Sequence, residues 1–161
     1  MNAISTEGEQ PMPDDLFVTR EVKIAAPPGV VFDYLTEPAK LMQWNTTAAE
    51  FDARVGGAYR FTVAGSHVAS GEVLELDPPR RLAYTWGWED NDITPPGSST
   101  VVFELEQDGD YTIVRLTHRD LPSKDACDAH AEGWEHYLPR LSLAAAGGDP
   151  GPDPWAQGSS D

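Results

Sequence analysis

The sequence predicts an α+β domain in which a long C-terminal helix covers an antiparallel sheet. Three observations lead to this prediction. One strand, at residues 16–24, precedes two short helical segments rather than a long crossover helix. Closely spaced segments of period-two hydrophobicity then fill residues 51–118, and strands with such short connections pair antiparallel. A segment with one apolar helical face follows from Ser123 onward.

The first strand is indicated by apolar residues at positions 16, 18, 22 and 24, with Arg20 as the one polar break. Residues 27–29 (PPG) end this strand, and proline suits the first turn of the helix that follows. Glu37 and Pro38 restart a second short helix. The two helices therefore form an insertion between the first strand and the rest of the sheet.

Turn residues separate the later strands. Gly56 and Gly57 tolerate positive backbone φ, and Asp108-Gly109 is a strong hairpin signal. The polar, proline-containing loop at residues 90–99 is expected either to cover one end of a cavity or simply to be mobile. The alternating segments are residues 51–55, 59–63, 68–76, 82–88, 101–105 and 112–118.

The last helix is predicted to begin after Ser123, whose hydroxyl suits an N-cap, with Asp125 near the positive end of the helix dipole. Pro139 lies inside this helix and removes one backbone donor, at a cost of about 3 kcal/mol in a helix interior. We therefore expect a kink or an early end there. The apolar stripe consists of Cys127, His130, Trp134, Tyr137, Leu138 and Leu141.

Charge and composition exclude several classes of protein. Eleven Lys and Arg against 27 Asp and Glu give a net charge of −16, so the basic clusters of a nucleic-acid binder are missing. No run of about 18 apolar residues exists, so we expect no membrane insertion. The single Cys127 excludes an internal disulfide framework and a Cys-rich zinc site. Because the N-terminus lacks a signal-peptide pattern, we expect a cytoplasmic protein and regard the glycosylation motif at Asn45 as chance.

Both ends are expected to be disordered. Residues 1–14 are polar and acidic, and residues 147–161 are rich in Gly, Pro, Asp and Ser, with little to bury. Trp155 is the exception, because it could dock on the body or stay loose in the tail. Residues 15–146 are therefore predicted to form one domain.

Five segments occur in a characteristic order: residues 55–61 (VGGAYRF), 77–86 (DPPRRLAYTW), 101–105 (VVFEL), 116–118 (LTH) and 133–141 (GWEHYLPRL). In these segments the sequence resembles the START-like (SRPBCC) superfamily, and most of all its branch of homologues of the activator of the heat-shock-protein-90 ATPase. The resemblance covers roughly residues 16–143, while Pro139 and the acidic tail depart from the usual pattern. It implies a helix-grip fold, in which a curved sheet wraps the last helix and leaves an apolar cavity.

The resemblance also implies a function, which is the binding of a lipid, polyketide or aromatic metabolite between sheet and helix. His118 lies on the same strand face as Leu116, so it could bond a ligand carbonyl, act as a base, or be purely structural. Arg20 could bind a ligand carboxylate or pair with a structural acid. The expected apolar ligand contacts are Tyr84, Trp86, Phe103, Leu116, Trp134 and Leu138.

Other functions remain open at this stage. Some relatives are polyketide cyclases or aromatases, or protect their producers from a metabolite, and His118 is the one weak candidate for a catalytic residue here. A co-chaperone-like module with an unknown protein partner is a third possibility. Cys127 and His130 have a spacing that could share a metal, but further ligands would be needed, so we expect no metal and no cofactor.

The tryptophans decide whether a cavity exists. An empty pocket of ~300 Å³ would forfeit roughly 7 kcal/mol of stability, at about 24 cal/mol per Å³. Such a space therefore holds ligand or water, or is filled by side chains. Trp86 and Trp134 could line the cavity or fill it.

Overall fold

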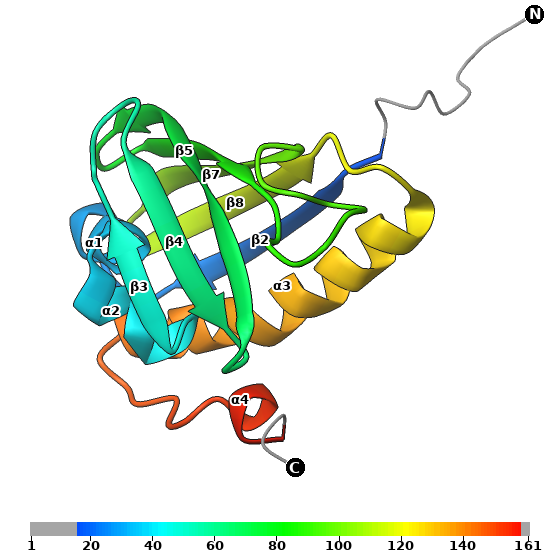
Figure 1. Cartoon of the computed structure of the whole chain (residues 1–161). Helices are drawn as coiled ribbons and strands as arrows, with labels where there is room; N and C mark the ends of the chain where they lie inside the picture. Colours follow the sequence, from blue (N-terminus) through cyan, green and yellow to red (C-terminus); the bar gives the residue numbers. More distant parts are fainter. Residues whose placement is uncertain (1–15, 159–161) are drawn as a thin grey trace, which may run out of the picture.

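The computed structural model describes residues 16–158, so the predicted N-terminal tail at residues 1–14 lies outside the described residues. The predicted fold class is confirmed: a curved, open, seven-stranded antiparallel sheet lies over a long C-terminal helix (Figure 1). The strand order is β2-β8-β7-β6-β5-β4-β3. The elements are β2 (Val18–Ile24), α1 (Pro28–Thr36), α2 (Pro38–Trp44), β3 (Ala48–Phe51), β4 (Ala58–Val63), β5 (His67–Asp77), β6 (Arg81–Trp86), β7 (Ser99–Asp108), β8 (Tyr111–Arg119), α3 (Lys124–Ala145) and α4 (Pro154–Gly158).

Local sequence sets the boundaries of these elements. Pro28 and Pro38 open α1 and α2, where a missing backbone N–H costs nothing. Gly109 adopts a φ of 62° in the turn between β7 and β8, a conformation that glycine tolerates best. Helices α1 and α2 pack at one end of the concave face of the sheet. Most of the remaining core residues lie on the strands and on α3.

Helix α3 keeps its apolar side against the sheet. Ser123 caps it as predicted, because its hydroxyl accepts a hydrogen bond from Ala126 N at 3.1 Å. The predicted early end at Pro139 is wrong, since the helix continues to Ala145. Burial explains the continuation: apolar residues on both sides of Pro139 pack into the core, and this packing outweighs the loss of one backbone hydrogen bond.

Aromatic side chains make the middle of the concave face solid. Tyr59 lies 4.6 Å from Phe61 and 4.8 Å from Tyr84, measured between ring centroids. Phe103 meets the ring of Trp134 edge-on at 5.9 Å, which joins sheet and helix. Sheet and helix are therefore in direct contact in the middle of the concave face.

The chain after α3 folds back onto the helix. We expected residues 147–161 to be disordered, whereas the described part, residues 147–158, packs against α3; we call it the C-terminal strap. Arg140 donates to the carbonyl oxygens of Pro150 and Gly151 at 3.3 and 2.8 Å. Asp153 accepts hydrogen bonds from His136 and Tyr137 at 2.8 and 2.6 Å.

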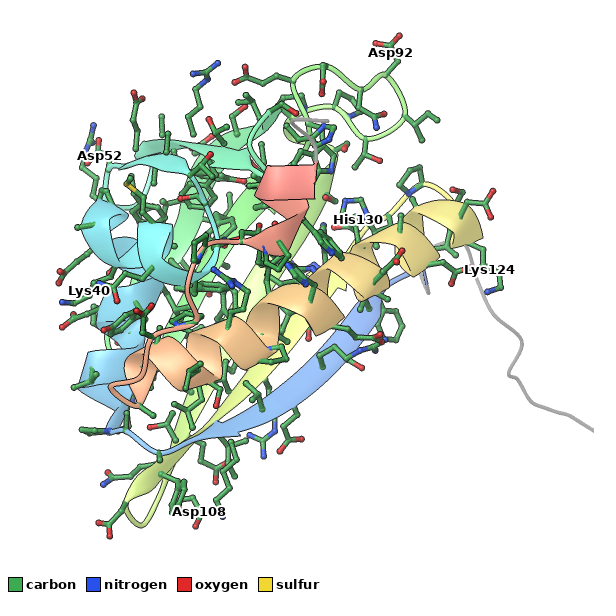
Figure 2. All side chains as sticks on the ribbon, turned by 90° about the horizontal axis from the view of Figure 1, so that it is seen from below. Lys40, Asp52, Asp92, Asp108, Lys124 and His130 are labelled. Atoms are coloured by element: carbon green, nitrogen blue, oxygen red, sulfur yellow. The ribbon has the colours of Figure 1, made fainter. Side chains whose placement is uncertain are left out.

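Charged side chains lie on the outside of this structure. In Figure 2 the labelled Lys40, Asp52, Asp92, Asp108 and Lys124 project outward from the ribbon. Pairs such as Lys23 with Asp108 and Lys124 with Asp128 are exposed, and such pairs contribute little to stability. None of the helices within residues 16–158 has the length and apolar character needed to cross a membrane.

Candidate ligand-binding pocket

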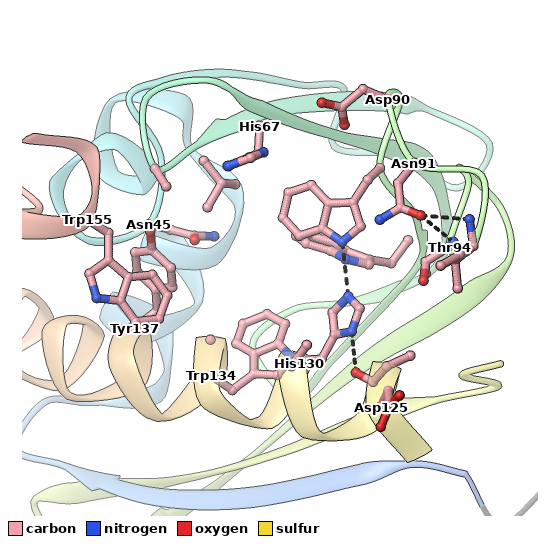
Figure 3. A pocket seen from close by; sticks show the side chains of 18 of the residues that line it. Asn45, His67, Asp90, Asn91, Thr94, Asp125, His130, Trp134, Tyr137 and Trp155 are labelled. Carbon is pink, nitrogen blue, oxygen red and sulfur yellow. Dashed lines mark hydrogen bonds between the residues drawn. The ribbon is translucent and has the colours of Figure 1, made fainter. Parts of the chain in front are cut away.

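A pocket of about 630 Å³ lies between α3, the end of β6, the loop at residues 87–98 and the C-terminal strap (Figure 3). We call residues 87–98 the front loop. Most of the wall is aromatic or aliphatic, and four of the five tryptophans contribute to it. The aromatic lining residues are Trp86, Trp88, Trp134, Tyr137 and Trp155.

The front loop is held in place by its backbone. Trp88 N donates to Thr94 O at 2.7 Å, and the Asn91 side chain accepts from Ile93 N and Thr94 N. Gly87 is required here, because a Cβ on it would lie 1.8 Å from Pro95 O. The loop therefore folds back over the pocket as a fixed turn, and it places Ile93 and Thr94 in the wall.

His118 is buried behind the tryptophans and has 0% exposure. The indole of Trp134 donates to His118 Nδ1 at 3.1 Å, so the proton of a neutral ring must sit on Nε2. That nitrogen lies 2.9 Å from Ser99 Oγ, which in turn donates to Trp86 O at 3.0 Å. Burial lowers the pKa of His118 well below its ordinary value, and the neighbouring His130 lowers it further. His118 is thus a neutral group with both ring nitrogens occupied.

His130 lines the pocket and connects α3 to the front loop. Its Nε2 accepts from the indole of Trp88 at 3.0 Å, and its Nδ1 lies 2.8 Å from Ala126 O (Figure 3). Because an indole can only donate, Nε2 is unprotonated and Nδ1 carries the hydrogen. Burial lowers the pKa of His130 as well, although the bond to Ala126 O acts in the opposite direction. The ring centroids of His118 and His130 are 4.7 Å apart, so two neutral imidazoles lie next to each other on the α3 side of the pocket.

The residues that the sequence analysis proposed as ligand contacts fall into three groups. Trp86 and Trp134 line the pocket. Arg20 lies on β2, where its guanidinium pairs with Glu135 of α3, and it does not line the pocket. The remaining five are buried in the core beside or behind the pocket and do not line it: Tyr84, Phe103, Leu116, His118 and Leu138.

The possible metal pair of the sequence analysis, Cys127 and His130, is not joined by further ligands. Among residues 16–158, no three His, Cys, Asp or Glu side chains are grouped closely enough to hold a metal ion. His67 lies at the pocket edge, with its ring meeting that of Trp88 at 6.3 Å, while His118 is fully engaged elsewhere. The donor set therefore does not assemble.

Sequence reasoning missed several pocket residues. Trp88 could have been found, because it alternates with Trp86 and so extends the same strand face. Trp155 and Tyr137 depend on the strap, which stacks Trp155 on His136 at a centroid distance of 3.8 Å. Asn45 gave no signal beyond a glycosylation motif, yet it is only 6% exposed and lines the pocket.

Two polar features of the wall remain unpaired. The buried indole nitrogen of Trp86 has no hydrogen-bond partner within residues 16–158. The side-chain amide of Asn45 makes no hydrogen bond to any described residue either. The charged residues in the lining are Asp90 and Asp125, and no described Lys or Arg contributes to it. The pocket is therefore apolar, with a few unsatisfied neutral polar groups and negative charge at one end.

A family model and a solved structure both relate this chain to the same protein family. Residues 25–146 match the family model described as Activator of Hsp90 ATPase homolog 1-like protein. The AHSA1-like protein from Rhizobium etli is 48% identical, with 86% of each chain covered and a TM-score of 0.70. A search of the curated proteins found no match.

Two further solved structures share the fold. CalU16 from Micromonospora echinospora is 29% identical over 84% of this chain and 69% of its own, with a TM-score of 0.69. DynU16, from the dynemicin biosynthetic locus, is 20% identical over 84% of this chain and 49% of its own, with a TM-score of 0.73, and shows a common fold.

Proposed function

We propose that this chain, which belongs to the Activator of Hsp90 ATPase homolog 1-like family of the START-like superfamily, binds a small hydrophobic molecule between its sheet and α3. The fold of this superfamily is compatible with hydrophobic ligands. The observation that carries this proposal is the aromatic pocket of about 630 Å³. Its volume falls in the range of sites that enclose small organic molecules. A lipid, a polyketide or an aromatic metabolite is the class of ligand that such a wall would bind.

The energetics favour occupancy. Burying about 200 Å² of a ligand's apolar surface would contribute roughly 5 kcal/mol at about 25 cal/mol per Å², before the cost of association. The tryptophan rings contact one another: Trp86 meets Trp88 edge-on at 5.4 Å between ring centroids, and it meets Trp134 in a tilted arrangement at 6.0 Å. The wall is therefore formed in advance and does not need to order when a ligand enters.

Binding is better supported than catalysis. A cyclase-type reaction needs an acid or base within reach of the substrate, whereas His118, the residue considered for that role, does not line the pocket and has both ring nitrogens engaged. His130 does line the pocket, but its two nitrogens are also occupied. The alternative of a co-chaperone-like module with a protein partner, which the family's name suggests, stays a prediction.

The proposal is tested first by native mass spectrometry of freshly purified protein, which should reveal a co-purified apolar molecule. A titration with the neutral fluorophore N-phenyl-1-naphthylamine follows, read by energy transfer from the four pocket tryptophans. We expect Ala129→Phe, which places a ring in the pocket, to weaken probe binding, whereas Glu132→Phe on the exposed side of α3 leaves it unchanged. No co-purified molecule together with no saturable probe binding would overturn the proposal.

A further inference from the structure

Asn45 is a buried amide in an otherwise apolar wall. It follows α2, where its backbone N–H donates to Leu41 O at 2.9 Å. The carbonyl of the preceding Trp44 accepts from Arg140 at 3.1 Å, and Thr46 N on the other side donates to Leu41 O at 3.2 Å, so the backbone is held on both sides of this position. In Figure 3 the Asn45 side chain points into the pocket beside Tyr137 and Trp155. The backbone that carries this amide is therefore fixed in place before any ligand arrives.

The amide is unpaired although its residue is 94% shielded from solvent, given an exposure of 6%. Its nitrogen and oxygen form no hydrogen bond with residues 16–158, and they are not among the fully enclosed side-chain atoms without partners. They consequently remain reachable from the open space that Asn45 lines, which is the aromatic pocket and the hollow that adjoins it. A buried amide without a partner is costly, so a ligand atom that pairs with it gains affinity relative to one that does not.

The charge of the lining restricts the ligand further. Asp90 and Asp125 lie at the end of the pocket opposite Asn45 (Figure 3), and no described cation lines it. Arg140 lies in an adjoining hollow that Asn45 also lines, but its guanidinium already donates to three backbone carbonyls and shares that space with the carboxylate of Asp153. A carboxylate entering the pocket would lose its hydration without gaining a counter-ion.

Building on the function proposed above, we infer that the ligand is an uncharged aromatic molecule whose carbonyl, amide or hydroxyl group pairs with the side-chain amide of Asn45. Asn45 acts as the specificity-determining residue. The tryptophans supply affinity for any ring of suitable size, and Asn45 selects the ring that carries a hydrogen-bonding group at its inner end. The acidic end and the absence of a lining cation reject carboxylates.

Three anthracenes of nearly equal shape test this inference: anthracene-2-carboxamide, 2-isopropylanthracene and anthracene-2-carboxylate. Each accepts energy from tryptophan, so one fluorescence titration at pH 8 measures all three. We expect the carboxamide to bind roughly threefold to tenfold more tightly than the isopropyl compound, as one neutral hydrogen bond provides. The carboxylate should bind at least about tenfold more weakly than the carboxamide, because its charge is desolvated without a partner.

The variant Asn45→Leu should abolish the preference for the carboxamide over the isopropyl compound. The ratio of the two affinities within one variant cancels any general effect on the pocket. If Asn45→Leu does not fold, the ranking of the three probes on the wild-type chain decides. Equal affinity of all three probes overturns the inference but leaves the proposed function standing, whereas failure of all three to bind, together with N-phenyl-1-naphthylamine, overturns both.

Discussion

Lowering the pH below 6.5 should destabilise the fold through the two histidines behind the pocket. Protonating His118 would place a donor where Trp134 already donates, and would put a charge in a site with no exposure to water. The folded-state pKa of His118 is therefore lowered well below the value of an unfolded histidine, about 6.5. Between those two values the unfolded chain binds more protons than the folded one. Stability is consequently present above pH 6.5 and is lost as the pH falls below it.

The magnitude follows from this difference in proton binding. A group that titrates near 6.5 only in the unfolded state lowers the free energy of unfolding by about 1 kcal/mol at pH 5.5 relative to high pH. Little of this loss is present at pH 7, so His118 should account for a loss on the order of 1 kcal/mol between pH 7 and 5.5. His130 adds a smaller loss of the same sign, because its pKa is also lowered. The carboxyl groups of lowered pKa, Glu89 and Asp153, titrate below this range and do not contribute.

Urea unfolding followed by circular dichroism at 222 nm, from pH 5.5 to 8, measures this loss. The matched control is His118→Gln, whose amide can still accept from Trp134 and donate to Ser99 but does not titrate. We expect the slope of unfolding free energy against pH to be clearly smaller in His118→Gln, whatever its absolute stability. Parallel curves for the two proteins down to pH 5.5 would refute the assignment of a buried, neutral His118.

Three other predictions concern the pocket wall. Gly133→Ala on α3 should raise the free energy of unfolding by about 0.5–1 kcal/mol in a thermal or urea melt, because a Cβ there meets nothing within 4 Å and alanine favours helix. A loss of stability would contradict this prediction. Gly87→Ala should lower the free energy of unfolding by roughly 1–3 kcal/mol and weaken probe binding, because the added Cβ collides with Pro95 O. Unchanged probe binding would mean that the front loop does not form the pocket wall. Asp153→Ala should release the strap and make Trp155 more accessible to acrylamide quenching, while quenching equal to that of the wild type would show that other contacts hold the strap.

Period-two patterns were sufficient to predict the sheet, because alternation fixes which face of each strand is buried. The same patterns did not show where on the concave face the packed core ends and the pocket begins. Tyr84 and Trp86 share one face of β6, yet only Trp86 reaches the pocket. That difference depends on which residues of β4 and α3 lie opposite, and strand periodicity contains no such information.

The strap and Asn45 were missed for a related reason. Composition predicted disorder after residue 146, because Gly, Pro and Asp bury little apolar surface. In the structure the strap is held by polar pairing instead, with Asp153 bound by His136 and Tyr137, and these partners can be identified only once the helix is placed. Asn45 likewise acquires its environment from segments distant in sequence.

The strap has one more consequence, which concerns how such pockets diverge. The residues shared with the family end at 146, whereas the wall formed by Trp155 lies beyond them. Changes at residues 149–155 can therefore widen or narrow the pocket without disturbing the core between sheet and helix. Two proteins with superimposable cores could thus accept molecules of different length, solely because their closing segments differ.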